Sequence, residues 1–372
     1  MKYDTDMLNC YPLSNSQLNI WNLEQSFCGT SINNICETIR IKGVLDVVLL
    51  QTCLNQILKA DPSLRTQITL DESQHPVQYE KEYEEILFPV FDFSATNITG
   101  FEHWENSVTR QVMPILDAPL YYFAIVKLSE HEGGVFIKTH HIISDGWSQV
   151  SLINRIAQTY LALLNREKVT LPLAPSYRLH VEKEQKYLSS KAAWRDRKFW
   201  QETLHDAGQA VSLKDHINAE LSPVGQRKTF YLSEKLNHAL NAFCTKHRVA
   251  PFAVFYMAMA IYLKRIRHAD KICIGAPIHN RMDITDRQTT GMFVSTLPFF
   301  TQLDENWSFE EFNRHLSDDW LDLLRHQRLP FSEIISAAKQ TSPDFERPFH
   351  LVLSFHNSQA YRNRDTLVTF SG

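Results

Sequence analysis

Glycine is scarce in this sequence, which has 11 glycines among 372 residues. Sites that fold a loop around nucleotide phosphates use several glycines, because a residue without a side chain lets the backbone come close to the phosphates. The scarcity argues against a large glycine-lined nucleotide site.

Cysteine and charge of one sign are also limited. The six cysteines form no CxxC pair and no disulfide framework, so we expect reduced thiols in a cytoplasmic protein. The net charge is −4, with acidic and basic residues interspersed along the chain. No surface for nucleic acid or an anionic membrane is therefore expected.

Long apolar runs are missing as well. The N-terminus lacks a basic region followed by an apolar run, so it does not resemble a signal peptide. The longest apolar helix expected, residues 252–263, is too short to span a membrane and contains Tyr256 and Tyr262. With 44% hydrophobic and 22% charged residues, the composition is that of a soluble globular protein of two domains, or of one large domain with two cores.

Hydrophobic periodicity predicts a mixed sheet flanked by helices. Helices are expected at residues 13–27, 46–59, 102–113, 149–165, 179–188, 192–204, 233–246, 251–266, 309–326 and 331–339. Strands are expected at residues 36–41, 65–70, 77–83, 121–127, 135–141, 228–232, 271–275, 292–301 and 350–355. The expected helix N-caps include Ser14 or Ser16, Asp46 and Ser233. Pro172 and Pro175 interrupt the pattern, and we place a lobe boundary there.

Two adjacent histidines stand at a strand-to-helix junction, in the stretch THHIISDGWS at residues 139–148. Neighbouring side chains of a strand point to opposite faces, so His140 and His141 are not expected to face the same cleft. One is expected to be structural and the other available for chemistry. A shared metal ion is not expected, because opposed side chains cannot bind one ion and no third ligand is nearby. A buried strand end is the alternative, although such a polar cluster is costly to bury without a purpose.

This junction resembles the HHxxxDG motif of condensation domains of nonribosomal peptide synthetases, which are relatives of chloramphenicol acetyltransferase. The resemblance implies an α/β (α+β) fold of two chloramphenicol-acetyltransferase-like lobes that form a V-shaped pseudodimer. The lobes are expected at residues 1–170, which carry the motif, and 171–372. The chain stops several tens of residues before such domains normally end, so the second lobe is expected to be truncated.

Further stretches are similar to the family's other motifs, in the family's order: residues 13–21, 61–66, 290–298, 326–331 and 347–357. In the family the arginine of the second stretch, here DPSLRT, pairs with the motif aspartate. This implies an ion pair between Arg65 and Asp145. The third stretch, TGMFVSTLP, resembles the GxFVNT motif on a segment that crosses between the lobes, with Ser295 in place of the asparagine. His326 in the fourth stretch is expected to pack rather than to catalyse.

The resemblance implies amide formation, in which the amine of a carrier-bound aminoacyl thioester attacks an acyl thioester. His141 is the expected catalytic residue, either as the base that takes a proton from the amine or as a group that only orients it. The backbone N–H of Gly146, at a helix start, is expected to stabilise the negative oxygen of the tetrahedral intermediate. His140 and Asp145 are expected to hold the turn.

A channel open at both ends would bring the two substrates to His141. Its expected lining consists of Trp147, Ser148, Gly291, Phe293, Ser295 and Thr296, with packing beneath the helix as the alternative for Trp147. No directly bound cofactor or metal is expected. The substrates would be carried on the phosphopantetheine of a carrier protein or on coenzyme A, and the thioester supplies the driving force.

The implied partners are peptidyl or acyl carrier protein domains, a downstream adenylation domain, and an acyl-CoA or acyl carrier donor, with the chain itself monomeric and bound neither to nucleic acid nor to a membrane. Only ten residues precede Tyr11, which favours a starter domain that attaches a fatty acyl chain to the first amino acid, as in lipopeptide biosynthesis. Ser295 and the stretch TSINN at residues 30–34 agree with this subtype. Two alternatives stay open: a stand-alone acyltransferase that uses coenzyme A, and a catalytically silent domain that recruits carrier proteins or tailoring enzymes.

Overall fold

The computed structural model describes residues 9–205, 210–214, 222–356 and 368–371. The chain divides into two compact units, of which the first comprises residues 1–186, 281–293 and 357–372 and the second residues 187–280 and 294–356. The boundaries of these units differ from those of the lobes predicted at residues 1–170 and 171–372. The first unit continues past the proline-containing stretch and takes in a short segment from much later in the sequence.

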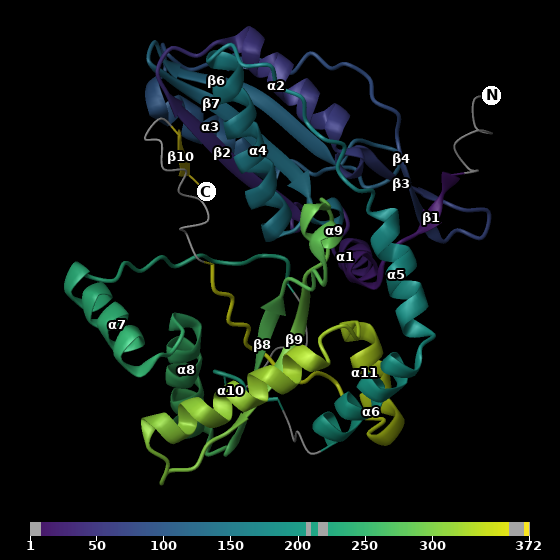
Figure 1. Ribbon diagram of the computed structural model, residues 1–372, viewed down its shortest axis with the longest axis vertical. Helices are drawn as coiled ribbons and strands as arrows, with labels where there is room; N and C mark the ends of the chain where they lie inside the picture. Colours follow the sequence, from purple (N-terminus) through teal and green to yellow (C-terminus); the bar gives the residue numbers. More distant parts are fainter. Residues whose placement is uncertain (1–8, 206–209, 215–221, 357–367, 372) are drawn as a thin grey trace. The chain divides into compact units, whose positions relative to one another are not determined.

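The first unit is built on a five-stranded sheet in the order β10-β2-β7-β6-β5 (Figure 1). Strands β5 and β6 run parallel, and the other neighbours run antiparallel. The strands are β2 (Asn34–Lys42), β5 (Val90–Asp92), β6 (Tyr121–Ser129), β7 (Glu132–His140) and β10 (Val368–Ser371). A second sheet in the order β1-β4-β3 contains β1 (Tyr11–Pro12), β3 (Thr66–Leu70) and β4 (Pro76–Glu80).

Helices of the first unit cover both faces of the larger sheet. Residues of α2 (Val47–Ala60) and α4 (Gly146–Leu164) share one core with the sheet, and residues of α3 (Asn97–Arg110) share the other. The unit also contains α1 (Asn15–Ser26), most of α5 (Arg178–Leu188) and the short α9 (Ile284–Gln288). On β6, Phe123 and Ile125 belong to the core that contains residues of α2 and α4, whereas Ala124 and Val126 belong to the core that contains Phe101 of α3. This alternation is what a strand between two helical layers requires.

The second unit has a two-stranded antiparallel sheet, β8 (Lys271–Ile278) with β9 (Ser295–Gln302). Its helices are α6 (Lys191–His205), α7 (Glu234–His247), α8 (Pro251–Arg267), α10 (Phe309–Arg325) and α11 (Phe331–Thr341). Trp200, Tyr256 and Phe299 lie in its core, where the Tyr256 hydroxyl donates to the carbonyl of Phe299 at 2.6 Å. The polar end of a buried tyrosine is thus satisfied inside the core.

Capping rules placed the starts of three helices, whereas α3 and α4 begin at Asn97 and Gly146 rather than at the predicted residues 102 and 149. Ser14, Asp46 and Ser233 are the N-caps of α1, α2 and α7, and Ser14 forms a capping box with Gln17. For α1, the structure selects Ser14 over Ser16.

Several predicted strands differ from the structure. The strand predicted at residues 228–232 is wrong, because these residues are irregular and pair with no described strand, and Tyr231 is 92% exposed. The strand predicted at 350–355 contributes a single bridge between Val352 and Gly275, and Asn357, the last residue of that motif, lies outside the described residues. Helix α9 was not predicted.

Among the described residues, no single helix is long and apolar enough to cross a membrane. Helices α7 and α8, which meet at a bend of 101°, pass a test of length and composition only when taken together.

We expect Gly134→Ala to lower the free energy of unfolding by about 3 kcal/mol, because overfilling a packed site strains the backbone around it. Gly134 lies on the central strand β7, and a Cβ atom there would overlap the backbone oxygen of Ile39 on β2. Urea denaturation measures the change. Gly225→Ala is the matched control, since a Cβ at Gly225 meets nothing within 4 Å. Equal stability of the two variants would contradict this account of the sheet.

Candidate functional site

The histidine motif lies where β7 ends and α4 begins. The backbone N–H of His140 donates to the carbonyl of Leu120 at 2.8 Å, and that of His141 donates to the carbonyl of Asn33 at 2.8 Å. The strand end is therefore held from both sides. A short 3-10 turn, η3 (His141–Ile143), then leads to Asp145, the N-cap residue of α4.

The two histidine rings have different environments. The His140 ring is buried, its Nδ1 accepts from the backbone N–H of Ile142 at 3.1 Å, and its Nε2 lies 3.5 Å from a carboxylate oxygen of Glu24. The His141 side chain is half-buried, and its Nδ1 has no hydrogen-bond partner among the described residues. Burial lowers the pKa of His141 below its usual value, against the opposing effects of backbone groups and of Asp145. The ring is therefore neutral at pH 7.

Asp145 is fully buried, and its carboxylate accepts four hydrogen bonds. Oδ1 accepts from the backbone N–H of Ser148 (2.9 Å) and from Nη2 of Arg281 (3.1 Å). Oδ2 accepts from Nη1 of Arg281 (2.7 Å) and from the backbone N–H of Phe293 (3.0 Å). Although burial disfavours the charged form, Arg281 and these N–H groups hold the pKa of Asp145 below its usual range. Neither oxygen has capacity left for a proton relay.

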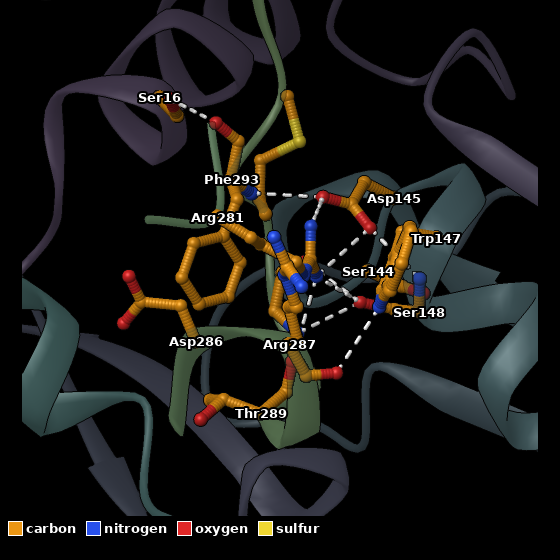
Figure 2. A network of polar contacts seen from close by, with 12 residues as sticks. Ser16, Ser144, Asp145, Trp147, Ser148, Arg281, Asp286, Arg287, Thr289 and Phe293 are labelled. Atoms are coloured by element: carbon orange, nitrogen blue, oxygen red, sulfur yellow. Dashed lines mark hydrogen bonds and ion pairs between the residues drawn. The ribbon is translucent and has the colours of Figure 1, made fainter. Parts of the chain in front are cut away.

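Arg281 opens a stretch, residues 281–293, that belongs to the first unit although the chain on either side of it belongs to the second. We call it the docked segment. Figure 2 shows the Arg281 guanidinium between Asp145 and Ser148. The Ser148 hydroxyl donates to the carbonyl of Gly291 (3.0 Å) and accepts from Gly291 N–H (3.1 Å) and from Arg281 Nη2 (2.8 Å). The start of α4 is thus bonded to both ends of the docked segment.

Further hydrogen bonds and ion pairs hold the docked segment along its length. The Thr290 hydroxyl donates to the buried carboxylate of Asp61 at 2.6 Å. Lys183 of α5 bridges Asp283 (2.7 Å) and Asp286 (2.8 Å), at the start of α9. The Trp147 indole N–H donates to the carbonyl of Arg287 at 3.1 Å (Figure 2).

Phe293, the last residue of the docked segment, belongs to a small group of rings. The ring of Phe293 lies 4.3 Å from that of His180 and 5.1 Å from that of Tyr177, between ring centroids, and the Arg281 guanidinium lies 4.0 Å from the Phe293 centroid. His180 Nε2 is buried and has no hydrogen-bond partner among the described residues. Burial lowers the pKa of His180 to about 4. Asp286 and Asp145 oppose that shift, whereas Arg281 and Lys183 add to it.

The predicted ion pair between Arg65 and Asp145 is wrong. Arg65 instead donates to backbone carbonyls: those of Leu58, Lys59 and Asp61 at the end of α2, and that of Lys81. The end of a helix leaves carbonyls without intrahelical donors, and a guanidinium with five N–H groups satisfies them. The DPSLRT stretch therefore contributes a buried carboxylate, Asp61, and no partner for Asp145.

The predicted channel residues fall into three groups. Ser148, Gly291 and Phe293 are buried within the first unit, where their contacts hold the docked segment, so the structure does not support a channel-lining role for them. Trp147 is 42% exposed. Ser295 and Thr296 begin β9 in the second unit.

Gly146 is the first residue of α4. Its N–H belongs to the first turn, whose N–H groups have no acceptor within the helix. The side chain of the capping residue Asp145 reaches the N–H of Ser148, two positions further on. Such a helix start offers a hydrogen bond to a negative oxygen.

Sequence reasoning missed Arg281, His180 and Glu24. The signal for Arg281 was the polar stretch HNRMD at residues 279–283, which places a lone arginine before a capping aspartate, but no local rule says that it reaches Asp145. In the part of the chain that the structure describes, no group of three or more His, Cys, Asp or Glu side chains has a geometry suited to a metal ion.

Comparison with known families gives a consistent result. A family model described as "Condensation domain" matches residues 7–371. Surfactin synthase subunit 1 of Bacillus subtilis is 29% identical over 370 residues, 97% of this chain and 10% of that protein. One plipastatin synthase protein of the same organism is 27% identical over 368 residues, 97% of this chain and 14% of that protein. The chain therefore spans a small part of these relatives.

Solved structures share the fold. The starter condensation domain of rhizomide synthetase, solved as a variant in complex with C8-CoA, has a TM-score of 0.81 at 23% identity, covering 94% of this chain and 79% of its own. The first condensation domain of the calcium-dependent antibiotic synthetase, in complex with a substrate analogue, has a TM-score of 0.80 at 20% identity, covering 93% and 79%.

We expect Arg281→Met to lower the free energy of unfolding by about 3–5 kcal/mol, because it leaves the buried Asp145 charge without a partner. Adding Asp145→Asn should restore part of this loss, since no uncompensated charge then remains. Urea denaturation of the single and double variants measures the coupling. Arg65→Met is the matched control: in that background, Asp145→Asn should lower the free energy of unfolding by as much as it does in the wild type. Coupling of Asp145 with Arg65 rather than with Arg281 would contradict the observed pairing.

His180 predicts a loss of stability in acid. An unfolded histidine binds a proton near pH 6.5, whereas His180 in the folded protein does so near pH 4, so acidification through this window favours the unfolded chain. Between these limits the loss is about 3 kcal/mol. His180→Leu should remove this part of the pH dependence, as measured by urea denaturation at pH 7 and pH 4.5. His103→Leu, on the exposed face of α3, should keep the wild-type slope; a His180→Leu slope equal to wild type would refute the assignment.

Proposed function

Because this chain belongs to the condensation-domain family of nonribosomal peptide synthetases, whose members form amide bonds, we propose that it joins a fatty acyl thioester to the amine of a carrier-bound aminoacyl thioester. The amine nitrogen attacks the thioester carbonyl, a C–N bond forms, and the C–S bond breaks to release a thiol. The proton lost by the amine ends on the departing sulfur.

One observation carries the assignment of roles. Asp145 accepts four hydrogen bonds, whereas the half-buried His141 has a ring nitrogen, the buried Nδ1, that finds no hydrogen-bond partner among the described residues. Among the titratable side chains of the described HHIISDG stretch, His141 is therefore the one with capacity for a proton.

His141 acts as the base in this proposal. The lowered pKa keeps its ring neutral at pH 7, as a proton acceptor requires. An α-amino group has an unperturbed pKa of about 8, so a fraction of the substrate is already neutral near pH 7, and His141 takes its proton as the C–N bond forms. The backbone N–H of Gly146, at the start of α4, stabilises the oxyanion.

The donor is the finer part of the proposal. The neighbour solved with C8-CoA is a starter condensation domain, and another form of it was solved with C8-CoA and Leu-SNAC together. These similarities concern the fold. They make a medium-chain acyl-CoA the first donor to test, with an acyl carrier protein as the alternative source of the acyl group.

Carrier and adenylation domains are the proposed partners. The curated relatives belong to large synthases, and this chain matches 10–14% of the length of the first two, so most of each relative lies in other regions. Condensation domains need no directly bound cofactor, and phosphopantetheine is the proposed arm for the acceptor. We also propose a cytoplasmic location for the chain, in agreement with its six described cysteines, which form no disulfide.

Incubating the chain with octanoyl-CoA and an aminoacyl-loaded carrier protein should give acyl-aminoacyl carrier, detected by intact-protein mass spectrometry. Product from an acyl carrier donor alone would move the donor away from coenzyme A. Acylation of a free amine or alcohol without a carrier would support a stand-alone acyltransferase. If the chain binds the carrier protein but gives no product with any donor, the catalytic proposal is wrong.

His141→Ala should lower kcat by roughly 100-fold or more, the range for loss of a positioned base. In the wild type, kcat should fall with acid through the lowered pKa of His141, below pH 6.5, and the variant should lack this limb. The exposed His103→Ala is the control. A small loss with an unchanged profile would show that His141 only orients the amine.

A further inference from the structure

Glu24 is a buried carboxylate outside the histidine motif. It lies on α1 and is 6% exposed. One of its oxygens, Oε2, accepts from the Asn33 side-chain amide at 2.6 Å and lies 3.5 Å from His140 Nε2. A charged group of this kind is rarely buried without partners, and here both partners also contact the backbone of the motif.

The two partners hold the backbone N–H groups of two consecutive residues, His141 and Ile142. The carbonyl of Asn33 accepts from the backbone N–H of His141 at 2.8 Å. The His140 ring accepts from the backbone N–H of Ile142 at 3.1 Å. The backbone of His141 is therefore fixed at its own N–H and at the N–H of the next residue, and both contacts lead back to Glu24.

The hydrogen bond at Nδ1 decides which nitrogen of His140 carries the ring proton. Nδ1 accepts from Ile142, so the proton resides on Nε2, and Nε2 faces Glu24. Although burial disfavours its charged form, hydrogen bonds from His140 and Asn33 hold the pKa of Glu24 below its usual range. The carboxylate stays charged and selects this tautomer.

Helix α1 holds the same turn at a second point. Gln17 and Glu24 are seven residues apart and therefore lie on one face of α1. Gln17 Nε2 donates to the carbonyl of Ile142 at 3.0 Å. The turn that presents His141 is thus held by two side chains from one helix, one neutral and one charged.

We propose that Glu24 is a positioning residue for the condensation reaction: through Asn33 and the Nε2–H tautomer of His140 it fixes the backbone on both sides of His141. The inference rests on the proposed function of His141. Its effect is on kcat, because a misplaced catalytic group slows the chemical step more than it weakens substrate binding.

Two substitutions separate the charge of Glu24 from its hydrogen bonds. Glu24→Gln keeps an acceptor oxygen and removes the charge, whereas Glu24→Met removes both. We expect kcat to fall roughly tenfold in the first and roughly 100-fold in the second, as for a catalytic group that is displaced, with KM for both substrates changed less than about twofold. Glu105→Gln on α3, which removes a carboxylate that accepts from Thr38, is the matched control and should retain wild-type kcat.

His140→Asn tests whether Glu24 acts through His140. An asparagine oxygen can still accept from Ile142, but the group that faces Glu24 is lost. If the route is correct, Glu24→Gln should add little to the loss in His140→Asn. Losses that multiply would show independent action and overturn this route. A lowered melting temperature with unchanged kcat would reduce Glu24 to a structural role.

A measurement without substrate keeps this inference separate from the proposed function. Long-range ¹H–¹⁵N spectra of histidine-labelled protein should show His140, identified by its loss in His140→Asn, as the Nε2–H tautomer, with a change of tautomer or exchange broadening in Glu24→Met. If the wild type makes no amide, the proposed function fails, and these spectra still decide whether Glu24 sets the tautomer of His140. An unaltered histidine spectrum in Glu24→Met would overturn the positioning role.

Discussion

The buried ion pair between Asp145 and Arg281 is the interaction on which the arrangement of the site depends. Both side chains are removed from water, and each is compensated by the other and by neutral hydrogen-bonding groups. Such a pair contributes little net stability compared with an apolar contact of the same size, but the loss of either member leaves a buried charge without a partner. It therefore fixes the start of α4 relative to the docked segment, two stretches more than 130 residues apart in sequence.

The same pair determines what the motif can do chemically. All four lone-pair positions of Asp145 are in use, so the carboxylate cannot exchange protons with His141. The His141 ring stays neutral and half-buried, and its Nδ1 has no hydrogen-bond partner among the described residues. The different roles of Asp145 and His141 follow from hydrogen-bond capacity alone: the carboxylate already accepts its full set of hydrogen bonds, whereas the imidazole does not.

Polar groups below the motif extend this order to α1 and to the residues before β2. Glu24, Asn33 and His140 are all buried, and each is satisfied only when the others are in place. Networks of this kind are costly when incomplete, because an unpaired group in a low-dielectric interior keeps its full desolvation penalty. They consequently favour a single geometry of the turn that presents His141.

The sequence by itself determined what depends on neighbours along the chain: the caps at Ser14, Asp46 and Ser233, most helices, the strands β6 and β7, and the family motif at the start of α4. These follow from local hydrogen bonds and from the periods of helices and strands. It did not determine which arginine pairs with Asp145. Arg65 and Arg281 both lie in polar stretches beside turns, and only the tertiary structure brings Arg281 to the carboxylate. Nor did it show that Tyr231 would remain exposed, since a strand forms only where another edge is present to pair with it. Long-range pairing of buried charges and strand edges was decided by the fold, because contacts between distant residues leave no trace in local pattern.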